Sequence, residues 1–144
     1  MSAEAAGNVF GGAIPVFRVE SLHAAMEYYI AVLGFHHNWG NQGFASVSRD
    51  RCNIFLSEGD QGHPGTWAWI GVEDAAALEA EYRAKGARIR HPATNYPWAY
   101  EMQIEDLDGN VLRFGSDSIR GRPFGEFLDM NGRLWPLSPE AETL

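Results

Sequence analysis

Alternating apolar and polar positions predict a β-hairpin near the C-terminal end of the chain. The segment PWAYEMQIEDLDGNVLRFG (97–115) holds two alternating runs, separated by a turn rich in Asp, Gly and Asn. One face of the hairpin carries Met102, Ile104, Leu112 and Phe114, and the other carries Glu101, Gln103, Glu105 and Arg113. The apolar face belongs against a core, so the polar face either meets water or lines a cavity.

The same order of elements, β-α-β-β-β, occurs twice along the chain. Strands are expected at 13–19, 36–40, 43–49 and 52–57 with a helix at 21–34, and again at 66–72, 87–91, 99–106 and 110–116 with a helix at 74–86. Ser21 and Asp74 are the expected N-caps, and Gly34 and Gly86 end the helices. The segment VESLHAAMEYYIAVLG matches VEDAAALEAEYRAKG with a one-residue gap, which indicates a duplication.

This duplication predicts an α+β fold with a single domain over residues 1–117. The domain consists of two βαβββ modules, at about 12–58 and 66–117, and EGDQGHPG (58–65) reads as a flexible linker between them. Residues 118–144 form a C-terminal extension. Its large apolar side chains could cover a module or add to a dimer contact; they are Phe124, Phe127, Leu128 and Trp135.

Strand alternation assigns each side chain to one of two faces. The face expected to pack on the helices carries Pro15, Phe17, Val19, Ile54, Leu56, Ala68, Ile70, Val72, Met102, Ile104, Leu112 and Phe114. The opposite face carries Ile14, Val16, Arg18, Phe44, Ser46, Ser48, Asn53, Phe55, Trp67, Trp69, Glu101, Gln103 and Arg113. This second set is too aromatic for a solvent face and too polar for a sealed core, and such a mixture is typical of a ligand cavity.

Composition excludes several other classes of protein. The chain of 144 residues has 11 basic and 19 acidic residues and a formal net charge of -8, which argues against nucleic acid as a partner and modestly favours a cationic ligand. No run approaches the roughly 20 apolar residues of a membrane span, and the N-terminus lacks a secretory signal pattern. We therefore expect a cytoplasmic protein. The single cysteine, Cys52, rules out an intrachain disulfide.

The motifs of a hydrolase or a nucleotide-binding enzyme are missing from the sequence. It holds no Gly-x-Ser-x-Gly segment, and its glycines do not follow a phosphate-binding or dinucleotide-binding pattern. His36 and His37 are neighbours on one expected strand, so they point to opposite faces and cannot both bind one ion.

Four segments together resemble the glyoxalase/bleomycin resistance protein/dioxygenase superfamily, also called the vicinal oxygen chelate superfamily. They are IPVFRVESLHAAMEYYIAVLGF, GFASVSRDRCNIFLSEGD, WAWIGVED and PWAYEMQIEDLDGNVLRFG, and the resemblance covers roughly residues 12–117. It implies that each module supplies half of a cupped mixed sheet and that the cups close around a site.

In the metalloenzymes of this superfamily, His, Gln or Glu on the first and last strands of each module bind a divalent ion. The corresponding positions here are Ile14, Phe55, Trp67 and Arg113. None of these side chains can bind a divalent cation, and Arg113 would repel one. The resemblance therefore favours the branch without a metal, and we expect no cofactor.

The bleomycin resistance proteins form that metal-free branch, and they sequester a large cationic glycopeptide between aromatic side chains. Trp39, Phe44, Trp69 and Trp98 resemble the aromatic residues of that cleft. The resemblance implies a homodimer with the cleft at its interface, and a binding protein rather than an enzyme. The full candidate ligand-binding set is Trp39, Phe44, Phe55, Trp67, Trp69, Trp98, Glu101 and Arg113.

Other interpretations of these residues remain open. Glu101 and Arg113 could form an ion pair on the cavity floor or a purely structural pair, and Trp67 and Trp69 could be core residues. The chain could be a metal-dependent lyase or dioxygenase with atypical ligands, namely His36 or His37, His91 and Glu101. It could also be a domain that binds an endogenous small metabolite.

Overall fold

The computed structural model describes residues 7–137 and contains two βαβββ modules followed by a short β-hairpin. The first module consists of β1 (Val16–Arg18), α2 (Leu22–Glu27), η1 (Tyr28–Val32), β2 (His36–Gly40), β3 (Phe44–Arg49) and β4 (Cys52–Ser57). The second consists of β5 (Trp67–Gly71), α3 (Ala75–Lys85), β6 (Arg88–Asn95), β7 (Tyr100–Glu105) and β8 (Val111–Ser116). The hairpin consists of β9 (Phe127–Leu128) and β10 (Leu134–Trp135). The predicted α+β class and the module architecture are confirmed.

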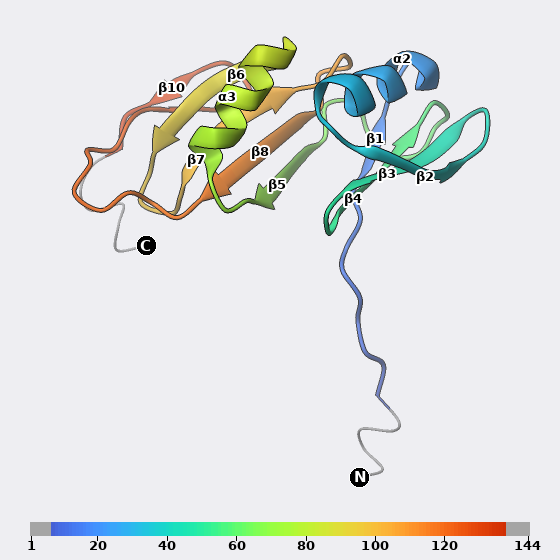
Figure 1. The fold of residues 1–144 in the computed structure, drawn as a ribbon, viewed down its shortest axis with the longest axis horizontal. Helices are drawn as coiled ribbons and strands as arrows, with labels where there is room; N and C mark the ends of the chain where they lie inside the picture. Colours follow the sequence, from blue (N-terminus) through green and yellow to red (C-terminus); the bar gives the residue numbers. More distant parts are fainter. Residues whose placement is uncertain (1–6, 138–144) are drawn as a thin grey trace.

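Each module forms a four-stranded mixed sheet with the same topology. The strand orders are β1-β4-β3-β2 and β5-β8-β7-β6, and in both sheets the first strand pairs in parallel with the last strand of its module. The two sheets lie side by side, with α2 above the first and α3 above the second (Figure 1). One face of each sheet is therefore covered by a helix of its own module.

Side chains from both modules share one hydrophobic core between the helices and the sheets. The residues predicted on the helix-packing face are buried there: Phe17, Val19, Ile54, Leu56, Met102, Ile104, Leu112 and Phe114. Ala68, Ile70 and Val72 are partly buried against this core. The period-two alternation thus identified the correct inner face of both sheets.

Two elements differ from the sequence expectation. The helix expected at 21–34 is an α-helix only as far as Glu27 and continues as a wider, π-type turn, in which the Leu33 amide donates to the Tyr28 carbonyl. Strand β6 is longer than expected and continues past Pro92 to Asn95. Proline is tolerated there because β6 is the edge strand of its sheet and its pairing with β7 is irregular at this point.

Polar contacts join the two modules on either side of the core. The Tyr82 hydroxyl on α3 donates to the Leu33 carbonyl at 2.8 Å, and burial raises the pKa of Tyr82 to about 12. Arg49 donates two hydrogen bonds to the Glu81 carboxylate, at 2.8 and 3.0 Å. At the other end, the Tyr29 hydroxyl donates to Asp106 in the β7–β8 turn.

The linker 58–65 contains no helix or strand, but the first module holds it in place. Arg18 donates to the carbonyls of Asp60 and Gly62, at 2.7 Å each. No helix within residues 7–137 is long and apolar enough to cross a membrane.

The C-terminal extension packs on the second sheet, on the face opposite α3. Its contacts there are made mainly through main-chain carbonyls: Leu128 accepts a hydrogen bond from Gln103, and Asp129 accepts one from Arg90. The polar face of the β7–β8 hairpin therefore meets neither bulk water nor an open cavity at Gln103, because the extension of the same chain covers it.

Replacing Glu81 tests the polar contact between the modules. The hydrogen bond from Arg49 lowers the pKa of Glu81, so its ionised form stabilises the fold above the ordinary carboxyl pKa, and this contribution is lost as the pH falls through the lowered value. We expect Glu81→Gln to be less stable than wild type at about pH 7 and the difference to shrink towards about pH 3.

Urea unfolding at several pH values measures this difference, and Glu73→Gln, at an exposed acidic residue just before α3, is the control. A Glu81→Gln protein as stable as wild type throughout would contradict the assignment.

Candidate functional site

The carboxylate of Glu101, on β7, is the centre of a polar cluster on the second sheet. Its side chain is only 1% exposed, and both of its oxygens accept hydrogen bonds. Arg113, on the neighbouring strand β8, donates to Oε2 at 2.8 Å and to Oε1 at 3.2 Å. The expected ion pair is thus present, and the buried charge of Glu101 is both neutralised and hydrogen-bonded.

Two tryptophans complete the contacts of this carboxylate. The indole N–H groups of Trp69 and Trp98 both donate to Oε1 of Glu101, at 3.0 and 2.7 Å. Although their polar edges are fixed in this way, the side chains remain 51% and 47% exposed. Because both rings contact the same carboxylate, they lie together on one surface, and neighbouring exposed aromatic rings are candidates for a binding role.

The C-terminal extension supports one of these rings. Trp98 lies in the turn between β6 and β7 and stacks on Tyr96, with ring centroids 4.8 Å apart and planes 7° apart. Phe127, on β9, meets both rings edge-on and lies 5.1 Å from the Arg113 guanidinium. The Tyr96 hydroxyl donates to the Glu126 carbonyl at 3.0 Å, which fixes the extension against this stack.

Trp67 lies apart from this cluster, although it is on the same strand as Trp69. The guanidinium of Arg90 lies 5.1 Å from its ring and also contacts Gln103 and the carbonyls of the extension. The structure therefore places Trp67 among structural contacts at the covered part of the sheet.

The remaining candidates form a second cluster, on the first sheet. Trp39, Phe44 and Phe55 lie together on the face opposite α2, with ring centroids 5.2 to 5.9 Å apart. Trp39 is 53% exposed. One chain thus presents two separate aromatic surfaces, one on each sheet.

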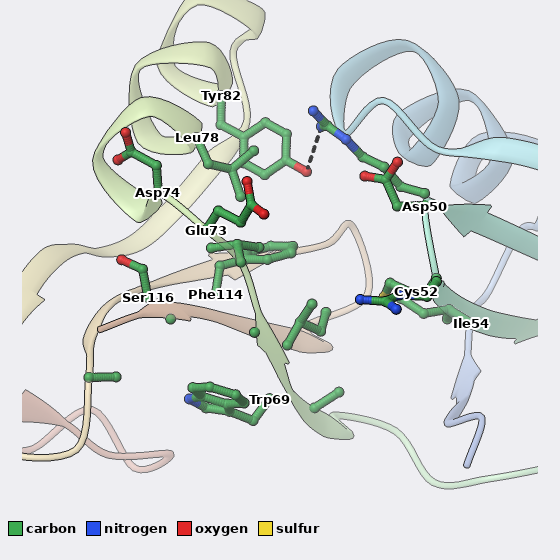
Figure 2. A pocket seen from close by; sticks show the side chains of 18 of the residues that line it. Asp50, Cys52, Ile54, Trp69, Glu73, Asp74, Leu78, Tyr82, Phe114 and Ser116 are labelled. Carbon is green, nitrogen blue, oxygen red and sulfur yellow. Dashed lines mark hydrogen bonds between the residues drawn. The ribbon is translucent and has the colours of Figure 1, made fainter. Parts of the chain in front are cut away.

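A groove of about 1140 Å³ runs between the modules. Its walls come from the β3–β4 turn, from β5 and from the start of α3, and Trp69 and Trp98 are among the residues that line it. In Figure 2, Trp69 and the core residue Phe114 lie on opposite sides of the second sheet. Five carboxylates also line the groove: Asp50, Glu73, Asp74, Asp117 and Glu81, the last of which is paired with Arg49.

The residues present do not fit a divalent metal. At the superfamily's metal-binding positions stand Ile14, Phe55, Trp67 and Arg113, which offer no suitable ligand atom. Within residues 7–137, no three side chains of His, Cys, Asp or Glu lie close enough to share an ion.

The atypical ligand set considered from sequence is not brought together either. His36 and His37 lie on β2, at the outer edge of the first sheet, whereas His91 and Glu101 belong to the second sheet (Figure 1). Within residues 7–137 of one chain, these four residues therefore do not form a metal site.

Sequence reasoning missed three residues of the Glu101 cluster. Tyr96 and Phe127 lie outside the alternating runs, so no periodic signal points to them. The third is Gly115, which lies within β8 next to Glu101. A glycine within an alternating strand pattern often marks the close approach of another group, and Gly115 is such a glycine in the sequence RFG (113–115).

With this geometry in place, comparison with known proteins identifies the family. The model of the Glyoxalase/Bleomycin resistance protein/Dioxygenase superfamily matches residues 13–114, and the chain belongs to that superfamily. The C-terminal extension lies outside the matched residues. Among the curated proteins compared by sequence, none matches this chain.

Solved structures of the same fold include antibiotic-binding proteins. The bleomycin-binding protein from bleomycin-producing Streptomyces verticillus, complexed with copper(II)-bleomycin, is 25% identical, with a TM-score of 0.67 over 78% of this chain and 100% of that chain. TnmS3, an antibiotic binding protein from Streptomyces sp. CB03234, is 20% identical, with a TM-score of 0.63 over 77% of this chain and 100% of that chain.

Removing Arg113 tests whether Glu101 depends on it. Arg113→Met leaves a buried carboxylate without its counter-ion, and we expect a loss of about 3 kcal/mol in the free energy of unfolding. In the double variant Glu101→Met/Arg113→Met no buried charge remains, and we expect part of the stability to return. Denaturant unfolding measures both. A single variant within about 0.5 kcal/mol of wild type would show that water already screens the pair.

Proposed function

We propose that this protein is a binding protein that sequesters an amphipathic, cationic aromatic antibiotic of the bleomycin type, without a metal cofactor of its own. The observation that carries the proposal is the pair Trp69 and Trp98, whose polar edges are fixed on Glu101 while about half of each residue's surface stays exposed. Rigid aromatic faces bind flat rings by stacking, and they favour cationic rings.

The likeness to the bleomycin-binding protein supports the same proposal. It extends over the whole of that chain at 25% identity. The net charge of -8 and the carboxylates of the groove would attract a cationic ligand and speed its capture at low salt.

We further propose that the ligand cleft is completed by a second copy of the chain in a cytoplasmic homodimer. In one chain the two sheets lie side by side rather than face to face, so the aromatic surfaces on them do not enclose a ligand (Figure 1). Residues 7–13 extend away from the first sheet, and their Val9 and Phe10 are 98% and 91% exposed. Exposed apolar groups of this kind favour an interface with another copy.

Trp98 should carry a large share of the ligand affinity. Truncation of a central aromatic contact costs about 2 kcal/mol or more, which is a factor of roughly 30 in Kd. We expect Trp98→Ala to lower the affinity for metal-free bleomycin by at least that factor in calorimetric titrations. Because Trp98 also donates a hydrogen bond to Glu101, the melting temperature of the Trp98→Ala protein should fall as well. Binding is therefore measured at a temperature well below the unfolding transition.

Trp135→Ala is the matched control, since Trp135 is similarly exposed but lies on β10 and donates to Asp129 instead. Equal affinity of the Trp98→Ala protein and wild type would remove Trp98 from the site. A wild-type protein that does not bind bleomycin would leave the family assignment in place and favour a different small molecule as the ligand.

The dimer should be visible in solution. Light scattering after size exclusion should give twice the 16.0 kDa mass of one chain at micromolar concentration. Phe10→Asp should shift the protein towards the monomer by placing a charge in the interface, whereas Ile30→Asp, on the exposed side of η1, should not. A monomeric wild-type mass would contradict the shared cleft.

A further inference from the structure

The ring of Trp69 lies flat across the second sheet. Trp69 is on β5, its hydrogen-bond acceptor Glu101 is on β7, and β8 runs between these two strands. To reach Glu101 the indole therefore crosses β8, and it does so at Gly115, which pairs with Gly71 on one side and with Glu101 on the other.

There is no room for a side chain beneath this ring. A Cβ atom added at Gly115 would lie 2.7 Å from Cζ2 of Trp69 and 3.2 Å from the Cβ of Ala99. The backbone itself does not require glycine, because the φ angle of Gly115 lies outside the left-handed region that favours glycine. Glycine weakens a strand, and the contact with Trp69 is the closest of the contacts here that exclude a larger residue.

The position of the Trp69 ring determines which interactions it can offer to a ligand. The indole N–H is the only hydrogen-bonding group of tryptophan, and in both Trp69 and Trp98 it is used by Glu101. One face of Trp69 rests on Gly115 and Gly71, so only its outer face is open. Such a surface recognises flatness and positive charge, and it offers no hydrogen bond to select among polar substituents.

We propose that Gly115 is a specificity-determining position, which holds Trp69 as a flat platform that binds planar cationic rings. This inference rests on the proposed function, because it concerns the same site. It adds that a single chain selects planar ligands, and that Gly115 does so through the position of Trp69, without touching the ligand.

The test compares Gly115→Ala with Gly71→Ala. A Cβ at Gly71 would meet the same ring at 3.4 and 3.7 Å, which are ordinary contact distances, so this variant should leave the ring in place. Ring position is read without a ligand from the indole N–H signals in ¹H–¹⁵N correlation spectra, with Trp69 assigned through Trp69→Phe. We expect the Trp69 signal to move in Gly115→Ala and to stay in Gly71→Ala.

The ligand probe is N-methylquinolinium, a planar aromatic cation, and its comparator is N,N-dimethyldecahydroquinolinium, a saturated cation of similar size. We expect the planar cation to shift the Trp69 signal of wild type and Gly71→Ala and to bind at least tenfold more weakly to Gly115→Ala. The saturated cation should bind wild type at least tenfold more weakly than the planar one. Equal binding of both cations, or unchanged binding to Gly115→Ala, would overturn the inference.

A double variant keeps the test decisive if Gly115→Ala folds poorly. In Gly115→Ala/Trp69→Ala the ring that meets the new methyl group most closely is gone and only the 3.2 Å contact with Ala99 remains, so the alanine at 115 should lower the melting temperature much less than it does in wild type. A drop of the same size in both backgrounds would mean that a feature other than the Trp69 ring requires the glycine, such as the contact with the Cβ of Ala99, and the inference would fail.

Bleomycin titration of wild type separates this inference from the proposed function. Binding of the planar cation with the expected dependence on Gly115, but no binding of bleomycin, would reject bleomycin as the ligand and support the platform. Binding of bleomycin with equal affinity to wild type and to a folded Gly115→Ala would reject the platform and support the proposed function.

Discussion

The buried carboxylate of Glu101 determines the arrangement of the second module's exposed face. A charge at 1% exposure is stable only with a counter-ion and hydrogen-bond donors. Arg113 supplies the charge, and Trp69 and Trp98 supply the two indole donors. The cost of leaving Glu101 unpaired thus fixes the positions of two aromatic rings, which stay rigid while half of their surface is in contact with solvent.

Most of the fold followed from local signals in the sequence. Alternation with a period of two placed Met102 and Phe114 on the core side of the sheet, and the caps at Ser21 and Asp74 began both helices, where each side chain accepts a hydrogen bond from the backbone. These signals succeed because they depend on residues close together in the chain. The π-type turn at Tyr28–Val32 escaped them, since it accompanies contacts between Tyr28, Tyr29 and the second module.

The candidate site was only partly predictable, and the reason is physical. Alternation assigns a residue to a face but does not say what covers that face, so Gln103 and Trp67 were grouped with Trp69 although the C-terminal extension and Arg90 cover them. The contact of Phe127 with Trp98 joins segments that share no sequence pattern. The aromatic residues form one cluster on each sheet because the topology divides the strands between two sheets. The strand pattern alone assigns all of these residues to the face opposite the helices and does not separate the two clusters.

The extension is attached to the second sheet chiefly through its backbone. Carbonyls of Glu126, Leu128 and Asp129 accept the hydrogen bonds that Tyr96, Gln103 and Arg90 donate, and Phe127 is the side chain that enters the aromatic stack. Every amino acid carries the same carbonyl, so mutations at 126 and 128 keep these hydrogen bonds as long as the path of the chain is preserved. Asp129 is different, because its carboxylate also accepts hydrogen bonds from the amides of Asn131 and Arg133 and from the Trp135 indole. Sequence change is therefore expected to be faster at 126 and 128 than at Phe127 and Asp129, and relatives with a similar tail would be recognised by the spacing of these two residues from the β7–β8 hairpin.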